Sequence, residues 1–288
     1  MRLPPFEFHA PTALEQVFEL LATYGAAARL MSGGTDLLPG LRTGKVRCEH
    51  VIALKRVAGL GGLEFDPARG LAIGAGAILA DVGRHPATRT HYPALASAID
   101  TLATVQVRNK GTVAGNLCNA SPCADTATPL MALGARVVLA GPDGRREVGV
   151  EEFLVGPDHT RLAQVELVER ILVPPPRAGL RTIFQKISPR SRVDIAAVNM
   201  TLALTTKGGA FEHVALFLGT VAPTPMRAAR AEKALEGREI NAENIEAAAL
   251  AARAECRPIT DLRATKEYKA HIVYVLTRRA LQTLTAEA

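Results

Sequence analysis

Through residue 58, apolar and polar positions follow a pattern that predicts strand, helix, then strand. A helix beginning near Pro11 carries its apolar residues at helical spacing on one face, at Leu14, Val17, Phe18 and Leu21. Thr12 as N-cap with Glu15 three residues later has the spacing of a capping box. Short apolar runs at 6–8, 27–31 and 51–54 predict strands. This order of elements favours a small parallel sheet.

The middle of the chain changes pattern. Apolar runs at 63–65 and 71–73 flank a turn-forming segment, which predicts a hairpin. Beyond it the periodicity predicts helices at 92–102 and 125–133 and strands at 135–139 and 168–173. Three consecutive prolines, Pro174–Pro176, cannot continue a helix or a central strand, so they predict a linker.

After the prolines, the pattern predicts antiparallel strands followed by helices. The strands are expected at 181–186, 196–204 and 214–218, and the helices at 226–235, 242–254 and 266–284. The fold class is therefore α+β. We expect a two-lobed first domain at 1–174, with lobes 1–58 and 59–174, and a C-terminal lobe at 178–288 of antiparallel sheet plus helices.

Composition excludes several classes of protein. The 288 residues are 48% hydrophobic and 22% charged, which is too apolar for a disordered chain. No apolar run is long enough for a membrane span, and no secretory signal is visible at the N-terminus. Four cysteines do not form a disulfide framework at this length, so a cytoplasmic, reducing location is expected. The formal net charge is +6, but the basic residues are scattered and Trp is absent, which argues against nucleic-acid binding.

Two loops carry the candidate chemistry. In the first, Ser32–Asp36 follows a strand, and its paired glycines allow backbone N–H groups to approach and cradle a pyrophosphate. A plain Gly-Gly turn is the alternative. The second, 111–125, is rich in small residues, hydroxyls and amides, with Thr112 and Asn116 as donors and Asp125 as acceptor for a polar ligand. The alternative is that this segment only leads into the helix that follows, with Asp125 as the cap of that helix.

Nucleophilic and metal sites are not predicted. No G-x-S-x-G occurs, and no two histidines lie at a ligand spacing. Cys118 and Cys123 are two thiols where a cluster needs four, and Cys48 and Cys256 lie far away in the sequence. We expect all four cysteines to have structural roles as small hydrophobic residues, and we assign no catalytic residue and no metal ligand.

Taken together, the motifs resemble the FAD-binding subunit of the molybdenum hydroxylase, or xanthine dehydrogenase, family, including the medium subunits of carbon monoxide dehydrogenases. The resemblance covers nearly the whole chain in order. Its signatures are Gly33–Asp36, Thr112–Asn116 with 120–122 and Asp125, 222–227, and 258–263 with Tyr268. It implies a vanillyl-alcohol-oxidase-like FAD domain followed by the C-terminal lobe.

The resemblance also implies which residues contact FAD. They are Leu30, Met31, Ser32, Gly33, Gly34, Thr35, Asp36, Leu37, Leu102, Thr112, Val113, Ala114, Gly115, Asn116, Asp125, Val168 and Lys186. The two loops would hold the pyrophosphate and ribityl side, and Lys186 would lie near the isoalloxazine ring. Leu102 stands where some relatives have Phe, which leaves an apolar contact in place of stacking. Ala114 stands where the family usually has Gly.

The function implied is electron transfer between FAD and iron–sulfur clusters on a small partner subunit, with molybdopterin on a large partner subunit and an external electron acceptor. A dimer of heterotrimers is expected. Relatives with an additional iron–sulfur cluster carry a cysteine-rich insertion near the position of Cys118, and this chain lacks it, so no cluster is predicted here. The alternatives are a stand-alone FAD oxidoreductase and an assembly module that has lost its flavin.

Overall fold

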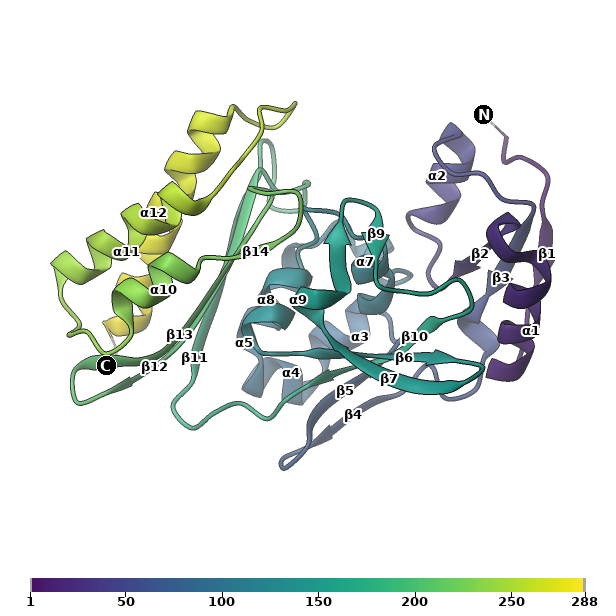
Figure 1. Cartoon of the computed structure of the whole chain (residues 1–288), viewed down its shortest axis with the longest axis horizontal. Helices are drawn as coiled ribbons and strands as arrows, with labels where there is room; N and C mark the ends of the chain where they lie inside the picture. The colour runs from purple at the N-terminus through teal and green to yellow at the C-terminus, as the bar shows by residue number, and fades with distance from the viewer. Residues whose placement is uncertain (1, 287–288) are drawn as a thin grey trace.

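The computed structural model describes residues 2–286, which form three main sheets arranged along the long axis of the molecule (Figure 1). The N-terminal lobe lies at one end, and the C-terminal helices cover the sheet at the other end. The α+β class predicted from the sequence is confirmed.

The first sheet is parallel, as predicted. Its order is β1-β3-β2, with strands β1 (Glu7–His9), β2 (Ala28–Met31) and β3 (His50–Ala53). Its other elements are helices α1 (Leu14–Tyr24) and α2 (Leu37–Thr43) and the short turns η1 (Gly25–Ala27) and η2 (Leu54–Arg56). Helix α1 connects β1 to β2 and buries Val17 and Leu21 against the sheet.

The predicted capping box is displaced by one residue. Ala13, not Thr12, is the N-cap of α1. Gln16, not Glu15, is the capping side chain: its Oε1 accepts from the backbone N–H of Thr12 at 2.8 Å and of Ala13 at 3.3 Å. The prediction failed because an amide oxygen one residue later satisfies the same free N–H groups without a hydroxyl at the cap.

The middle sheet is antiparallel, in the order β4-β5-β10-β6-β7. The strands are β4 (Leu63–Asp66), β5 (Gly70–Gly74), β6 (Arg136–Gly141), β7 (Gly144–Gly149) and β10 (Leu167–Val173), and a two-stranded ribbon is formed by β8 (Leu154–Gly156) and β9 (His159–Thr160). The helices are α3 (Leu79–Arg84), α4 (Pro86–His91), α5 (Pro93–Thr101), α6 (Val105–Arg108), α7 (Val113–Cys118), α8 (Ala127–Ala132) and α9 (Val150–Phe153).

One apolar core joins the first two sheets. It runs from Val17 and Ile52 in the N-terminal lobe to Ile73, Leu130 and Ile171 in the middle lobe. The two lobes are therefore packed as one unit despite their different sheets, which holds the loops between them in a fixed geometry.

The segment after the middle sheet is an extended linker, as the prolines predicted. Its start is fixed, because the Tyr92 hydroxyl donates to the Pro174 carbonyl at 3.0 Å. Tyr92 itself is fully buried.

The C-terminal lobe is an antiparallel sheet in the order β11-β12-β13-β14, with helices on one face and the middle lobe on the other (Figure 1). Its elements are β11 (Arg181–Ile187), β12 (Val198–Lys207), β13 (Ala210–Gly219), β14 (Met226–Arg227), α10 (Ala229–Leu235), α11 (Ala242–Glu255) and α12 (Lys266–Thr285). The helix expected from 226 begins only at Ala229, because Met226 and Arg227 pair with β13. Strand pairing there took precedence over the helical pattern.

Candidate cofactor site

Two backbone segments meet where the N-terminal lobe contacts the middle lobe. The first is the turn at Ser32–Asp36 between β2 and α2, and the second is Lys110–Thr112, which leads into α7. A Cβ on Gly33 would lie 2.7 Å from Gly111 Cα and closer still to the Lys110 carbonyl. Glycine is therefore required at 33 by the close approach of the two backbones, and Gly34 adopts φ 72°, which also favours glycine.

Hydroxyl groups tie the two segments together. Thr112 Oγ1 donates to Ser32 Oγ at 3.3 Å, and Ser32 Oγ donates to the Ala75 carbonyl at 3.1 Å. Thr112 is also the N-cap of α7, since its Oγ1 accepts from the Gly115 N–H at 3.0 Å. The segment predicted as one long loop thus contains a helix, because a hydroxyl N-cap precedes an apolar turn.

The turn after β2 leaves its backbone donors free. Within residues 2–286, none of the N–H groups of Gly33–Leu37 donates to a protein acceptor. Asp36 and Leu37 begin α2, where N–H groups have no intrahelical partner, and together with the glycine turn they form a row of free donors that could bind an anion.

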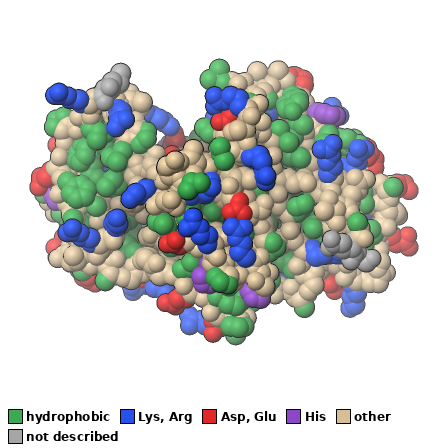
Figure 2. All heavy atoms as spheres, turned by 180° about the vertical axis from the view of Figure 1, so that it is seen from behind, with side chains coloured by type: hydrophobic (Ala, Val, Ile, Leu, Met, Phe, Trp, Pro, Cys, Tyr) green, Lys and Arg blue, Asp and Glu red, His purple; other side chains and the backbone are tan. Residues whose placement is uncertain are grey.

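These segments line a pocket of about 510 Å³. Among the residues predicted to contact cofactor, the pocket is lined by Leu30, Met31, Ser32, Gly33, Gly34, Thr35, Asp36, Leu37, Leu102, Thr112, Gly115 and Asn116. Seen from behind, the molecule is hollowed at the top between the N-terminal lobe and the remainder, with Lys and Arg side chains on both sides (Figure 2). The structure thus brings the two loops to one cavity.

Five predicted residues do not line this pocket. Val113 and Ala114 are buried in the first turns of α7 within the core, and Val168 is a core residue of β10. Asp125 and Lys186 face each other in a separate cluster behind it. The pocket and the cluster are adjacent at residues 101 and 102. Leu102 lines the pocket, and Lys186 Nζ donates to the carbonyl of the preceding residue, Thr101, at 3.1 Å.

The Asp125 cluster is closed and hydrogen-bonded. Lys186 Nζ lies 2.5 Å from Asp125 Oδ2, and the side chains are 4% and 6% exposed. Asn199 Nδ2 donates to the other carboxylate oxygen at 2.9 Å. Burial raises the pKa of Asp125, and Lys186 and Asn199 offset part of that rise. Asp125 thus pairs with Lys186 and Asn199. It does not cap α8, whose N-cap is Thr126.

Charged residues of the pocket went unnoticed in the sequence. Arg29, Lys45 and Arg47 line it, together with Asp158 from the turn between β8 and β9. The signal was the pair of basic residues at 45 and 47, which the overall scatter of positive charge concealed. Lys45 lies 3.5 Å from Asp158, and both are exposed. Burial raises the pKa of Asp36, which also lines the pocket.

Cys118 lies in the pocket wall as a thiol. Burial raises its pKa to about 12, so it is protonated at neutral pH. All four cysteines are free. Among the described residues, no helix is both long and apolar enough to cross a membrane.

Comparisons with known proteins agree along the whole chain. The family described as "FAD binding domain in molybdopterin dehydrogenase" matches residues 4–176, and the "CO dehydrogenase flavoprotein C-terminal domain" matches residues 184–284. The carbon monoxide dehydrogenase medium chain of Hydrogenophaga pseudoflava is 32% identical over 98% of both chains. The putative xanthine dehydrogenase FAD-binding subunit of Escherichia coli is 29% identical over 98% of this chain and 96% of its own.

Solved structures show the same similarity. A chain of the carbon monoxide dehydrogenase from Hydrogenophaga pseudoflava that lacks the Mo-pyranopterin moiety superposes with a TM-score of 0.95 at 35% identity, covering 99% of both chains. A chain of quinoline 2-oxidoreductase from Pseudomonas putida 86 superposes with a TM-score of 0.93 at 27% identity, covering 100% of this chain and 99% of its own.

Proposed function

The chain belongs to the FAD-binding subunits of the molybdopterin dehydrogenases, and from this premise we propose that the pocket between Gly33–Leu37 and α7 holds the pyrophosphate of FAD. The chain is an oxidoreductase subunit with an FAD-binding domain and a flavoprotein C-terminal domain. The similarity to medium subunits spans the whole chain, which supports this function over a stand-alone FAD oxidoreductase.

The residues present fit the proposed cofactor. The unpaired N–H groups of Gly33–Leu37 point to an anion, and the basic side chains of Arg29, Lys45 and Arg47 add positive charge to the same pocket. A pyrophosphate is dianionic and suits both. The unpaired N–H row is the single observation that supports the assignment most directly. When bound, FAD supplies the redox chemistry, and the protein sets its orientation and access.

Each wall of the pocket has a role in this proposal. The turn after β2 binds phosphate oxygens through backbone N–H groups, while Thr112 and Asn116 offer a hydroxyl and an amide to the ribityl side. Leu102 supplies an apolar wall, and Leu30 and Met31 lead from β2 into the turn. Val113 and Ala114 act through the backbone of α7, because their side chains are buried in the core.

Asp125, Lys186 and Val168 support the pocket from behind in this proposal. Lys186 holds the Thr101 carbonyl, directly before Leu102, and Asp125 holds Lys186. Because the Lys186 charge is paired with a carboxylate at 2.5 Å, its effect on a flavin potential should be smaller than that of a free ammonium. Val168 packs in the core beneath α7.

We further propose that the chain passes electrons between its FAD and iron–sulfur clusters on a small partner subunit, with molybdopterin on a large partner subunit. The printed names of relatives as medium chains and FAD-binding subunits support this assembly. An external acceptor, a dimer of heterotrimers and a cytoplasmic location complete the proposal. The four free cysteines are consistent with a reducing compartment.

Absorbance near 450 nm of the purified chain, with chromatography of the cofactor released by heat, tests the assignment. We expect about one FAD per chain, and the Gly33→Ala variant should lose it. A chain folded and empty of flavin, even after incubation with FAD, would overturn the proposal. Purification of the complex from its natural host tests the assembly separately, because molybdenum and iron should accompany two further subunits.

A further inference from the structure

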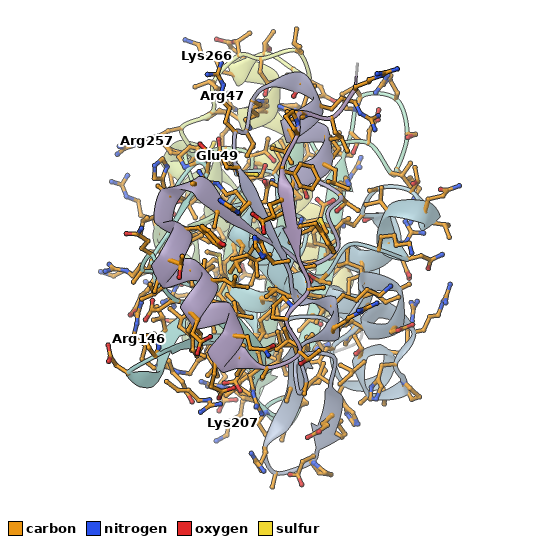
Figure 3. The ribbon with its side chains drawn as sticks, turned by 90° about the vertical axis from the view of Figure 1, so that its right-hand side faces the viewer. Arg47, Glu49, Arg146, Lys207, Arg257 and Lys266 are labelled. Atoms are coloured by element: carbon orange, nitrogen blue, oxygen red, sulfur yellow. The ribbon has the colours of Figure 1, made fainter. Side chains whose placement is uncertain are left out.

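Three potential metal ligands share one face of the N-terminal sheet, on the side of its edge strand. In the parallel pairing of β1 with β3, Glu7 lies opposite His50. His9 follows Glu7 by two residues, so its side chain emerges on the same face of the strand. Figure 3 looks onto this lobe, with α1 and β1 toward the viewer and with Arg47 and Glu49 on the segment that leads into β3.

The ligand atoms of these residues converge. His9 Nε2 lies 3.1 Å from His50 Nδ1. The Glu7 carboxylate places Oε2 3.5 Å from His50 Nδ1 and Oε1 3.8 Å from His9 Nε2. Around a tetrahedral Zn²⁺ with bonds of about 2.0–2.2 Å, ligand atoms lie about 3.3–3.5 Å apart. The two histidine nitrogens lie close to that spacing. The carboxylate approaches each nitrogen with a different oxygen, and one ligand atom from each of the three residues lies within 4.8 Å of the other two.

Hydrogen bonding alone does not account for the carboxylate. The two imidazole nitrogens, 3.1 Å apart, are within hydrogen-bond distance of each other. The Glu7 oxygens, at 3.5 and 3.8 Å, are beyond the usual hydrogen-bond length to either nitrogen. One ligand atom from each of the three residues nevertheless lies within 4.8 Å of the other two, close enough for all three to bind one cation.

The surroundings fix the rings and leave one side open. The Tyr24 ring, at the end of α1, stacks on His50 with ring centres 3.6 Å apart and planes 15° apart, and it lies 5.2 Å from the His9 ring. The histidine side chains are only 14% and 16% exposed, whereas that of Glu7 is 62% exposed. Water therefore has access on the carboxylate side, where it can supply a fourth ligand.

We propose that Glu7, His9 and His50 bind one divalent transition-metal ion of the Zn²⁺ class. Two imidazole nitrogens and one carboxylate suit Zn²⁺ and its neighbours, whereas Ca²⁺ and Mg²⁺ prefer oxygen ligands throughout. The sequence predicts no such site, because His9 and His50 lie 41 residues apart and are brought together only by strand pairing.

The ion would cross-link β1 and β3, because two of its ligands come from β1 and the third from β3. Strand β1 has three residues and pairs with β3 alone, so few hydrogen bonds hold it. On its other side, β3 pairs with β2, which leads into the turn at Ser32–Asp36. The site is independent of the proposed cofactor pocket, and none of its three residues lines that pocket.

The test uses the full-length, tag-free, FAD-containing chain after dialysis against EDTA, titrated calorimetrically with ZnCl₂. We expect about one Zn²⁺ per chain. The His50→Ala and Glu7→Gln variants should weaken binding by at least about tenfold, because loss of even a residue behind a metal ligand has that effect. In the wild type, Co²⁺ should give the visible absorption bands of tetrahedral coordination, and these should be absent in His50→Ala.

His271→Ala is the matched control, because His271 is exposed on α12 and belongs to no such cluster. It should bind Zn²⁺ as the wild type does. Glu7→Gln changes an exposed side chain, so it keeps the test valid if His50→Ala folds poorly. Equal Zn²⁺ affinity in the wild type and Glu7→Gln, or no saturable binding in the wild type, would overturn the proposal and leave a hydrogen-bonded histidine pair.

Discussion

Two polar regions differ in whether their hydrogen-bonding groups are satisfied. In the turn at Gly33–Leu37, a row of N–H groups has no acceptor among the described residues and faces a pocket. In the Asp125–Lys186 cluster, carboxylate and ammonium are buried against each other, and Asn199 completes the set. The resemblance to the family assigns both regions to the cofactor. The first offers free donors to a pocket, whereas the second has its charges paired with each other.

The difference shows how a ligand site and a structural cluster can be distinguished by hydrogen bonding. Unpaired donors beside a cavity remain available to a ligand that displaces water. A buried ion pair with hydrogen-bonded neighbours instead fixes the position of the elements that carry its members. Here it joins the segment before α8 to β11 and β12 of the C-terminal lobe.

The largest effect is expected from Lys186→Met. It leaves the Asp125 carboxylate buried and without its cation, which should lower the free energy of unfolding by about 3–5 kcal/mol at neutral pH. Denaturant unfolding followed by circular dichroism measures this.

The deficit should depend on pH. Without Lys186, the already raised pKa of Asp125 rises further, so the folded variant binds a proton more tightly than the unfolded chain. The variant should therefore be least destabilised at low pH, where Asp125 is protonated. Its free energy of unfolding should fall relative to wild type as pH rises above 3.8, the ordinary pKa of Asp, until it passes the pKa of Asp125 in the folded variant. The double variant Asp125→Asn, Lys186→Met should recover most of the loss at neutral pH. A double variant as unstable as the single one would show that the charge pair is not the cause.

Gly33→Ala addresses the other region. The added Cβ would overlap the backbone at Lys110 and Gly111, so the two loops must move apart. We expect the free energy of unfolding to fall by about 1–3 kcal/mol and FAD to be lost. The ratio of 450 nm to 280 nm absorbance reports the FAD content. Gly61→Ala is the matched control, because nothing lies within 4 Å of its Cβ. Full flavin content in Gly33→Ala would contradict the assignment of this turn.

A second lysine–aspartate pair sharpens the comparison. Lys269 Nζ lies 2.9 Å from Asp261 Oδ2, and the Asp261 side chain is 21% exposed. Burial acts to raise the pKa of Asp261, but the nearby Lys269 ammonium and the hydrogen bonds from the N–H groups of Arg263 and Ala264 lower it to about 2.

Because this pKa is depressed, the stabilisation is present above the unfolded value of 3.8 and is lost as pH falls toward 2. Acid unfolding of the wild type should show a loss of about 2 kcal/mol over that range. In Asp261→Asn this part of the pH dependence should disappear. An unchanged acid profile would mean that Asp261 is not the titrating group.

The smallest effect is expected from Thr112→Val. It removes the N-cap hydroxyl of α7 and its hydrogen bond to Ser32. The free energy of unfolding should fall by about 1 kcal/mol, and FAD retention should weaken slightly. Thermal unfolding and the rate of FAD loss on dilution measure both effects. Thr112→Ser keeps the hydroxyl and should behave as wild type. Wild-type stability and FAD retention in Thr112→Val, with losses only in Thr112→Ser, would point to the methyl group instead.

Most of the fold could be predicted from periodicity and turn residues, because each sheet is built from segments with a clear pattern. The parallel N-terminal sheet, the 63–73 hairpin and the proline linker are examples. One error arose from strand pairing and the other from a local helix cap. Met226 pairs with β13 instead of starting a helix, and Gln16 replaces the expected capping pair.

The site was predictable in part. Both loops are visible in the sequence because glycine and short hydroxyl residues are concentrated there, and the structure brings them together. That Lys186 pairs with Asp125 could not be read from the sequence, since they are 61 residues apart. The basic residues of the pocket were likewise missed, because charge has no periodicity that marks a shared cavity.

The buried Asp125–Lys186 pair has a consequence for cooperativity. Its two charges come from segments that fold into different lobes, so neither half of the chain can neutralise its own charge alone. Each half, once separated, would hold an uncompensated ion in an apolar setting. The two halves are therefore thermodynamically interdependent, and the chain should melt in a single transition in place of two.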